Sequence, residues 1–203
     1  MMKKSQVMAR PLDRKKVPNV VVVGSVACGK STVGFQLAHL LGMGAMDVDK
    51  RIELIQGKSI EMIFQEEGEE SFREMETQVI SGIANIMNHV VITGAGAVER
   101  QENWDHLRTI GPVVWLATPL SESVRRLAMK PDEMRSRPLL ADAVSIEDRK
   151  EREDFLMGKM SDLFDRRKDA YHKADVTVVS SYSTPEVCAQ MIKQKLMMNG
   201  MDT

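Results

Sequence analysis

The chain is poor in several features that would indicate a special class of protein. Its 203 residues include only two cysteines, Cys28 and Cys188, far apart in the sequence. They do not form a disulfide framework, so we expect a reducing compartment, the cytoplasm. No apolar run approaches the roughly 20 residues of a membrane-spanning helix. The formal net charge of −1 argues against nucleic acid or a membrane surface as the main partner.

The first 18 residues lack the apolar segment of a secretory signal, and we expect no such targeting role. These residues include six lysines and arginines, and Asp13 is the one acidic residue among them. We interpret residues 1–18 as a flexible basic tail, as is common at chain ends. The length of the remainder fits one domain over residues 19–203.

Short apolar segments alternate with longer amphipathic ones from Asn19 onward. The former are predicted to be strands buried on both faces, because they are β-branched and nearly continuously apolar. Helical spacing of apolar residues predicts a helix over Phe72–Met87, and Thr184 with Pro185 predicts the start of the last helix. This order favours an α/β fold in three layers, with a five-stranded parallel sheet flanked by helices. The predicted strands are Val20–Val23, Ala45–Val48, Val90–Thr93, Val113–Ala117 and Val176–Val179.

A charged segment with two prolines, Met129–Leu140, reads as an exposed loop. The region that follows, Asp142–His172, is charged and predicted to be mostly helical. No spacing of the four histidines indicates a metal site.

The sequence from Gly24 to Ser31 has the form G-x-x-x-x-G-K-S and lies between a predicted strand and a predicted helix. This context is the one that a phosphate-binding loop requires. Backbone N–H groups and the start of the helix attract phosphate, the lysine reaches the outer phosphates, and the serine hydroxyl can bind Mg²⁺. The motif indicates a nucleoside triphosphate without defining the reaction. The predicted ATP-binding residues in this loop are Gly24, Ala27, Cys28, Gly29, Lys30, Ser31 and Thr32.

Two carboxylates, Asp47 and Asp49, follow the second predicted strand. If the chain is extended there, alternate residues share a face, and both would emerge at the carboxyl edge of the sheet, where ligands bind in such folds. One could face Mg²⁺ and the other could accept a hydrogen bond from a substrate hydroxyl. The alternative is that Asp49 only caps the next helix.

Four short motifs, of which these aspartates form the first, follow one another along the chain. They are Asp47-Val48-Asp49, Phe72-Arg73-Glu74-Met75-Glu76, Gly94-Ala95-Gly96-Ala97-Val98 and Arg137-Pro138-Leu139-Leu140. The combination resembles the shikimate kinase family, from about Val20 to Ala189. A region near Arg167, which ends in Ala174-Asp175, resembles the family's R-x-x-A-Y-x-x-A-D form.

The resemblance implies a P-loop kinase fold with a mobile lid, here about residues 129–145. It implies ATP-dependent phosphorylation of shikimate to shikimate 3-phosphate in chorismate and aromatic amino acid biosynthesis, with Mg²⁺ as cofactor. Lys30, Asp49 and Arg137 would be catalytic, with Arg137 also binding ATP, and Ser31 with Asp47 would hold the metal. Substrate-binding residues would be Asp49, Arg73, Gly94, Ala95, Gly96 and Arg167, with Glu76 orienting Arg73. We expect a monomer.

The chain departs from the family pattern at Ala27 and Ala95, where glycine is common. Ala95 interrupts the glycine triplet, and if its backbone needs a positive φ angle, alanine costs roughly 1–2 kcal/mol there, whereas with a negative φ the change is harmless. Two other functions stay open, and the two alanines favour only the second. One is another small P-loop kinase acting on gluconate or a nucleotide, and the other is a shikimate-kinase-like protein that binds ligands without catalysis.

Overall fold

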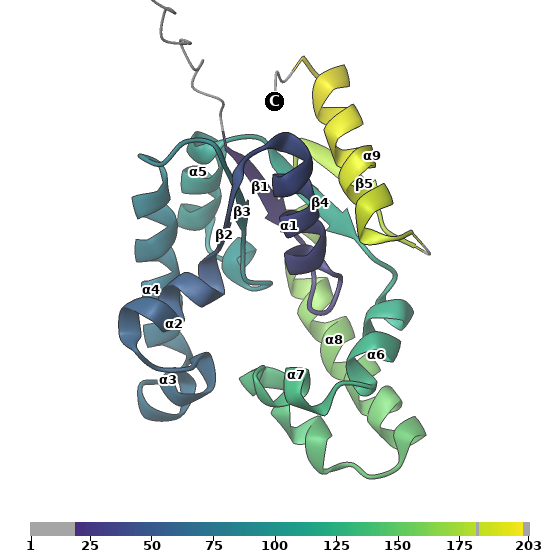
Figure 1. The fold of residues 1–203 in the computed structure, drawn as a ribbon. Helices are drawn as coiled ribbons and strands as arrows, with labels where there is room; N and C mark the ends of the chain where they lie inside the picture. Colours follow the sequence, from purple (N-terminus) through teal and green to yellow (C-terminus); the bar gives the residue numbers. More distant parts are fainter. Residues whose placement is uncertain (1–18, 182, 201–203) are drawn as a thin grey trace, which may run out of the picture.

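The structure is a computed structural model, and it describes residues 19–181 and 183–200. Five parallel strands form one sheet in the order β2-β3-β1-β4-β5 (Figure 1). Their bounds are β1 Val20–Val23, β2 Gly44–Asp47, β3 His89–Ile92, β4 Val113–Ala117 and β5 Val176–Val179. The predicted α/β fold is confirmed, although β2 and β3 each begin and end one residue earlier than expected. The predicted tail, residues 1–18, lies outside the described residues.

Helices cover both faces of the sheet and gather at its carboxyl edge (Figure 1). Helices α1 and α9 pack together on one face, and α4 packs beside α5 on the other. The helices are α1 Lys30–Leu41, α2 Val48–Gln56, α3 Ile60–Glu66, α4 Gly68–Ile83, α5 Gln101–Ile110, α6 Leu120–Ala128, α7 Pro131–Arg135, α8 Arg149–Tyr171 and α9 Pro185–Met198, with 3₁₀ turns η1 Ala97–Glu99 and η2 Pro138–Ser145.

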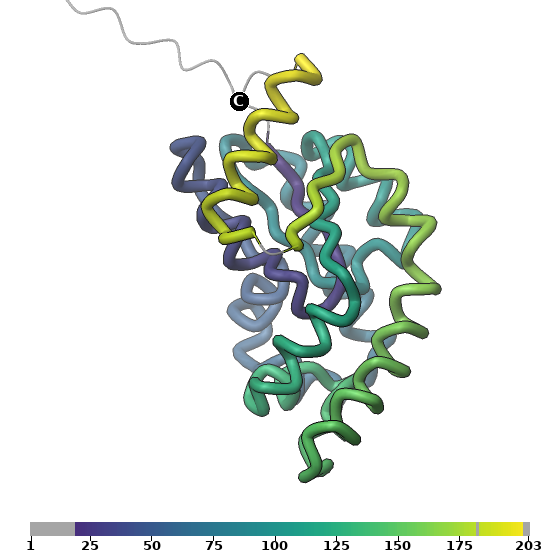
Figure 2. Tube along the Cα trace, turned by 90° about the vertical axis from the view of Figure 1, so that its right-hand side faces the viewer, coloured from purple at the N-terminus to yellow at the C-terminus, as the bar shows by residue number. Residues whose placement is uncertain are grey.

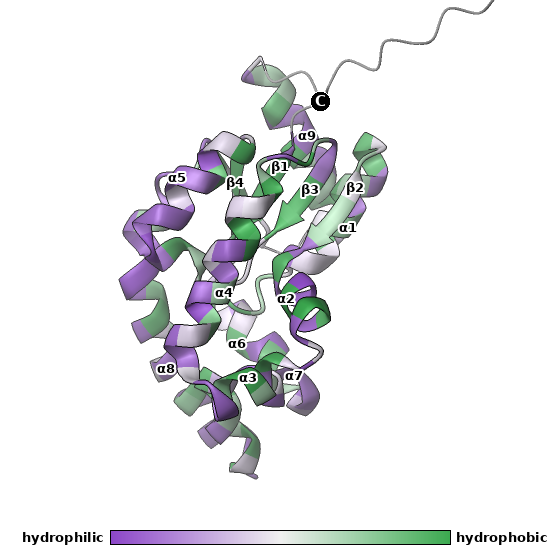
Figure 3. Ribbon diagram, turned by 90° about the vertical axis from the view of Figure 1, so that its left-hand side faces the viewer, coloured by the Kyte–Doolittle hydropathy of each residue, from purple (hydrophilic) through white to green (hydrophobic). Residues whose placement is uncertain are grey.

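The central strand β1 explains why the sheet needs both layers of helices. Val20 and Val22 belong to the core beneath α1 and α9, whereas Val21 and Val23 belong to the core beneath α4 and α5. All four side chains are fully buried. Removing apolar surface from water on both faces contributes about 25 cal/mol per Å² and fixes the three layers. Figure 3 shows hydrophobic strands inside a shell of mixed helices.

Helix α4 ends at Ile83, four residues before the end predicted from its apolar stripe. The Asn19 side chain accounts for the early end. Its Nδ2 donates to the Ile86 carbonyl at 2.5 Å, and its Oδ1 accepts from the His89 N–H at 2.8 Å. These bonds turn the chain into β3. At the start of α9, the predicted cap Thr184 accepts from the Val187 N–H, as expected.

The segment predicted to be an exposed loop, 129–140, instead contains α7 and the start of η2. That prediction was wrong because Met134 and Leu140 are buried in a third core formed with α6 and α8. Figure 2 shows this region at the lower end of the molecule, beside the start of α8. Among the described residues, no helix is both long enough and apolar enough to cross a membrane.

Candidate functional site

The loop from Gly24 to Gly29 joins β1 to α1 and is open to an anion. Gly29 precedes α1 in a left-handed conformation (φ 97°), and no side chain caps the first turn of the helix. Its first N–H groups therefore remain available to phosphate oxygens. The Lys30 ammonium donates to the carbonyls of Gly24 and Ser25, each at 2.8 Å. Burial lowers the pKa of Lys30, against the opposing effect of Cys28.

Ala27 is one of two non-glycine residues with a positive φ angle in the described chain, the other being Asn88. Its φ of 55° is left-handed, so the replacement of a family glycine at Ala27 carries a conformational cost. Ala95 is not among these residues, and its replacement of a glycine is not strained in this way.

Ala27→Gly should stabilise the protein by about 0.5–1 kcal/mol, because relief of the left-handed strain exceeds the greater entropy of an unfolded glycine. This corresponds to a rise in Tm of roughly 2–4 °C at most for a domain of this size. Gly57→Ala is the matched control, since Gly57 has φ 64° with no atom near a would-be Cβ. It should lower Tm. An unchanged or lower Tm for Ala27→Gly would contradict the strain.

The two aspartates near the end of β2, Asp47 in the strand and Asp49 in α2, have different environments from those predicted. The chain is not extended through both, because α2 begins at Val48. Asp47, rather than Asp49, caps α2 by accepting from the Lys50 N–H at 3.3 Å. Its other oxygen accepts from Ser31 Oγ at 3.0 Å. The capping alternative for Asp49 is therefore wrong.

Asp49 lies in the first turn of α2 with its Oδ1 buried and without a hydrogen-bond partner. Burial, and secondarily the charge of Asp47, raises the pKa of Asp49. A buried, unpartnered carboxylate oxygen beside a phosphate-binding loop is suited to accept a proton from a ligand hydroxyl.

Gly94 follows β3 and passes very close to two carboxylates. A Cβ at Gly94 would lie 2.6 Å from Glu76 Oε1 and 2.7 Å from Asp49 Oδ1, so any larger residue would displace one of these carboxylates. Glu76 is fully buried, and its Oε1 also lacks a partner. Burial raises the pKa of Glu76 to about 7, although the adjacent Arg73 opposes the shift.

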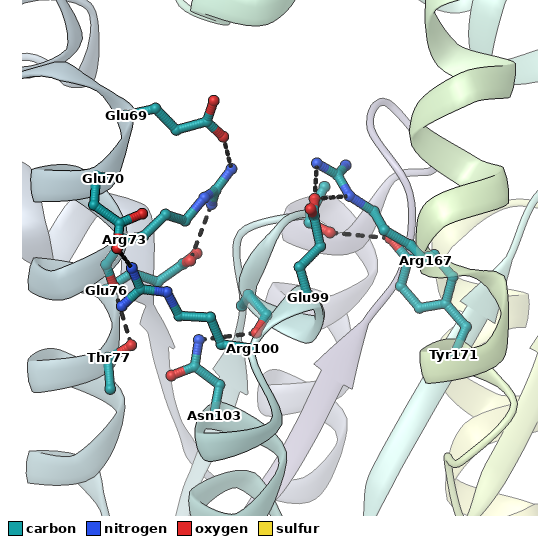
Figure 4. A network of polar contacts seen from close by, with 12 residues as sticks. Glu69, Glu70, Arg73, Glu76, Thr77, Glu99, Arg100, Asn103, Arg167 and Tyr171 are labelled. Carbon is teal, nitrogen blue, oxygen red and sulfur yellow. Dashed lines mark hydrogen bonds and ion pairs between the residues drawn. The ribbon is translucent and has the colours of Figure 1, made fainter.

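Arg73 and Arg167 extend from α4 and α8 towards the same loop (Figure 4). Arg73 donates to Glu76 Oε2 and Glu69 Oε1, each at 3.0 Å. A Cβ at Gly96 would lie 2.4 Å from Arg73 Nη2, so the loop backbone approaches this guanidinium closely. Arg167 is 3% exposed, whereas Arg166 is exposed, which agrees with the choice of Arg167 from the sequence.

Two adjoining cavities contain most of the predicted site residues. The first, of about 380 Å³, is lined by Ala27, Gly29, Lys30, Ser31, Thr32 and Asp47, among others. The second, of about 90 Å³, is lined by Arg73, Glu76, Gly94, Gly96 and Arg167, among others. Asp49, Ala95 and Arg137 line both. A group passing from a ligand in one cavity to a ligand in the other would pass these residues.

Some predicted residues lie outside this pair of cavities, and some neighbours were not predicted. Gly24 and Cys28 do not line either cavity, and Cys28 is 1% exposed. The sequence did not indicate Glu69 or Glu99, which contact the arginines. Glu99 lies 68 residues from Arg167 in the sequence, and no local pattern reveals such a pair. A further cavity of about 240 Å³, between α2 and α4, contains none of the predicted residues.

The chain is similar to known proteins over most of its length. The family model described as shikimate kinase matches residues 26–197. The curated shikimate kinase of Nostoc punctiforme is 38% identical over 175 residues, which cover 86% of this chain and 88% of the relative. That of Persephonella marina is 38% identical over 167 residues, covering 82% and 92%.

Solved structures of the same name share the fold. Shikimate kinase from Acinetobacter baumannii in complex with shikimate has a TM-score of 0.79 and 32% identity, covering 93% of this chain and 97% of that one. Shikimate kinase from Aquifex aeolicus has a TM-score of 0.72 and 28% identity, covering 90% and 98%. From its motifs, sheet and family match together, the chain belongs to the shikimate kinase family.

Proposed function

We propose that this protein transfers the γ-phosphoryl group of ATP to the 3-hydroxyl of shikimate. The observation that carries the proposal is the position of Asp49 and Arg137 on the boundary between two cavities. One cavity has a phosphate-binding loop, and the other has two arginines suited to a carboxylate. Shikimate combines a carboxylate with ring hydroxyls, so it can bridge from the arginines to Asp49.

ATP would place its phosphates on the loop N–H groups, with Lys30 released from the Gly24 and Ser25 carbonyls to bind the β- and γ-phosphate oxygens. Arg137 would bind the transferred group, since its Nε is buried without a partner and its Nη2 is 3.7 Å from Glu133 Oε2. The positive charges of Lys30 and Arg137 would stabilise the negative charge that develops on the phosphoryl oxygens during transfer.

Ser31 and Asp47 fit Mg²⁺, because they present adjacent hard oxygen ligands and Mg²⁺ binds proteins through one or two such groups plus substrate phosphates. When bound, Mg²⁺ would neutralise charge on the phosphates. These two residues hold their oxygens in place through the Ser31–Asp47 hydrogen bond and the cap on α2.

In the transfer step the shikimate oxygen forms a bond to the γ-phosphorus, and the bond from that phosphorus to the ADP oxygen breaks. The hydroxyl proton passes to Asp49, whose raised pKa keeps it a competent acceptor. Arg73 and Arg167 would hold the substrate carboxylate and orient the ring. The segment 129–145, which carries Arg137, would act as the lid over both ligands.

The direct test is release of ADP by the full chain with ATP and Mg²⁺, with and without shikimate. Shikimate-dependent release that is absent with gluconate or nucleoside monophosphates would support the proposal. Turnover with one of those alternatives alone would indicate another small P-loop kinase. Binding of shikimate without any ADP release would favour the non-catalytic alternative.

Arg73→Ala should raise KM for shikimate by roughly 10- to 150-fold, the equivalent of a charge-assisted hydrogen bond, while KM for ATP changes little. Arg73→Lys should recover only part of the loss, because an ammonium keeps the charge without the bidentate fork. Arg100→Ala is the control, since Arg100 binds Glu70 on the surface. Steady-state kinetics on protein verified as folded decides the point. A rise in KM for ATP without a rise in KM for shikimate would contradict the assignment of Arg73 to the substrate carboxylate.

A further inference from the structure

The two arginines differ in how their glutamate partners hold them. Nε and Nη2 of Arg167 both donate to one oxygen, Glu99 Oε1, at 2.6 and 2.5 Å (Figure 4). These two donors form one of the edges by which a guanidinium binds a carboxylate. In the structure, that edge of Arg167 is therefore occupied by a carboxylate of the protein itself.

The partners also differ in how easily they can leave. The Glu76 side chain is fully buried, so it cannot move into water and stays with Arg73. The Glu99 side chain is 32% exposed. A carboxylate that is already partly hydrated loses little when it leaves an ion pair for solvent. Glu99 can therefore be displaced, whereas Glu76 is a permanent partner.

The charge around the arginines indicates that a carboxylate must give way. Two guanidinium groups are in contact with three glutamates, namely Glu69, Glu76 and Glu99. Above the raised pKa of Glu76, where all three glutamates are ionised, this group of five side chains has one negative charge in excess, and below it, with Glu76 protonated, the group is neutral. An incoming carboxylate would add another negative charge to a partly buried site, which is unfavourable unless a resident carboxylate moves away.

We infer that Glu99 is an internal carboxylate that occupies Arg167 in the empty site and is exchanged for the carboxylate of the substrate, and that it thereby sets the affinity for shikimate. This inference rests on the proposed function for the identity of the substrate. Glu99 is an affinity-determining residue in this sense. It competes with the substrate for Arg167 and does not support Arg167 in binding it.

The exchange does not require the glycine-containing loop to move. Glu99 ends the turn η1, directly after Gly94–Gly96. The Tyr171 hydroxyl donates to the Ala95 carbonyl at 3.0 Å and ties the loop to α8 independently of Glu99. Rotation of one side chain is then enough to open Arg167, with the loop N–H groups left in place.

The test is Glu99→Gln, which keeps the size of the side chain and removes its charge. We expect KM for shikimate to fall roughly 5- to 50-fold, a range set by a charge-assisted contact reduced by partial exposure. We expect kcat and KM for ATP to stay within about twofold, since the change acts on a binding contact. The loss of a merely structural contact would not improve binding.

Glu70→Gln is the matched control. It removes the same charge from the neighbouring surface, where Glu70 is 80% exposed and pairs with Arg100. An equal gain in Glu70→Gln would show a general effect of net charge and overturn the inference. A higher KM for shikimate in Glu99→Gln would overturn it as well, because Glu99 would then position Arg167 for the substrate.

A second measurement separates this inference from the proposed function. Calorimetric titration of the full chain with cyclohexene-1-carboxylate reports carboxylate binding without phosphoryl transfer. Tighter binding to Glu99→Gln than to the unsubstituted protein supports the exchange, even if no turnover with shikimate is found. Equal or weaker binding contradicts it, whatever the result of the kinase assay.

Discussion

Lys30→Ala is expected to reduce kcat by roughly a thousandfold while leaving a folded protein. Lys30 is the side chain of the phosphate-binding loop that can carry positive charge to the β- and γ-phosphates. In the structure its ammonium donates to the carbonyls of Gly24 and Ser25. Its loss removes charge stabilisation that no neighbour on the loop can supply, because the other contacts there are neutral N–H groups.

The measurement is ADP release at saturating shikimate and ATP, with circular dichroism to verify the fold. Lys58→Ala is the control, because Lys58 forms surface ion pairs with Glu66 and Glu67, away from the phosphate-binding loop. Near-normal turnover of Lys30→Ala would be incompatible with a kinase that uses this loop.

Asp49→Asn is expected to lower kcat by at least about a hundredfold, within the usual contribution of a general base. Asparagine keeps the shape of the side chain but cannot take the hydroxyl proton. The structure also predicts the effect on stability. Burial raises the pKa of Asp49 above the value of an aspartate in the unfolded chain. At neutral pH, where the aspartate of the unfolded chain is ionised, burying this carboxylate therefore lowers the stability of the folded protein. The neutral asparagine should therefore leave Tm unchanged or raise it by a few degrees.

Asp47→Asn provides the contrast. Asparagine caps helices about as well as aspartate, so α2 should remain intact. If Asp47 serves the metal, its defect should be partly relieved by excess Mg²⁺ through mass action, whereas that of Asp49→Asn should not. Titration of Mg²⁺ against kcat for both variants decides this. If Asp49→Asn retains most of its turnover, the assignment of different roles to the two carboxylates fails.

The elements that the sequence predicted well are those with strong local signals. β1, β4 and β5 have the predicted bounds, because continuous β-branched segments bounded by turns have few alternatives. The phosphate-binding loop was equally clear, since its glycines, lysine and serine act through backbone geometry that is local in the chain. The family resemblance was carried by such short motifs in order.

The errors came where tertiary contacts outweighed local preference. The charged segment 129–140 appeared to be a loop, yet Met134 and Leu140 form a core with α6 and α8. The end of α4 is fixed by Asn19, which is 67 residues away from Ile86. Asp47 became the helix cap because the chain turns at Val48, where an extended strand was expected.

The sequence alone thus indicated the residues that we propose for this chemistry, whereas the contacts and burial that restrain them depend on the tertiary structure. Nothing in the local sequence indicates that Glu99 forms an ion pair with Arg167, or that the carboxylates of Glu76 and Asp49 both lie against Gly94. These contacts join separate helices and loops that meet only when the sheet is assembled. Burial, which raises the pKa of both Asp49 and Glu76, likewise exists only in the folded chain.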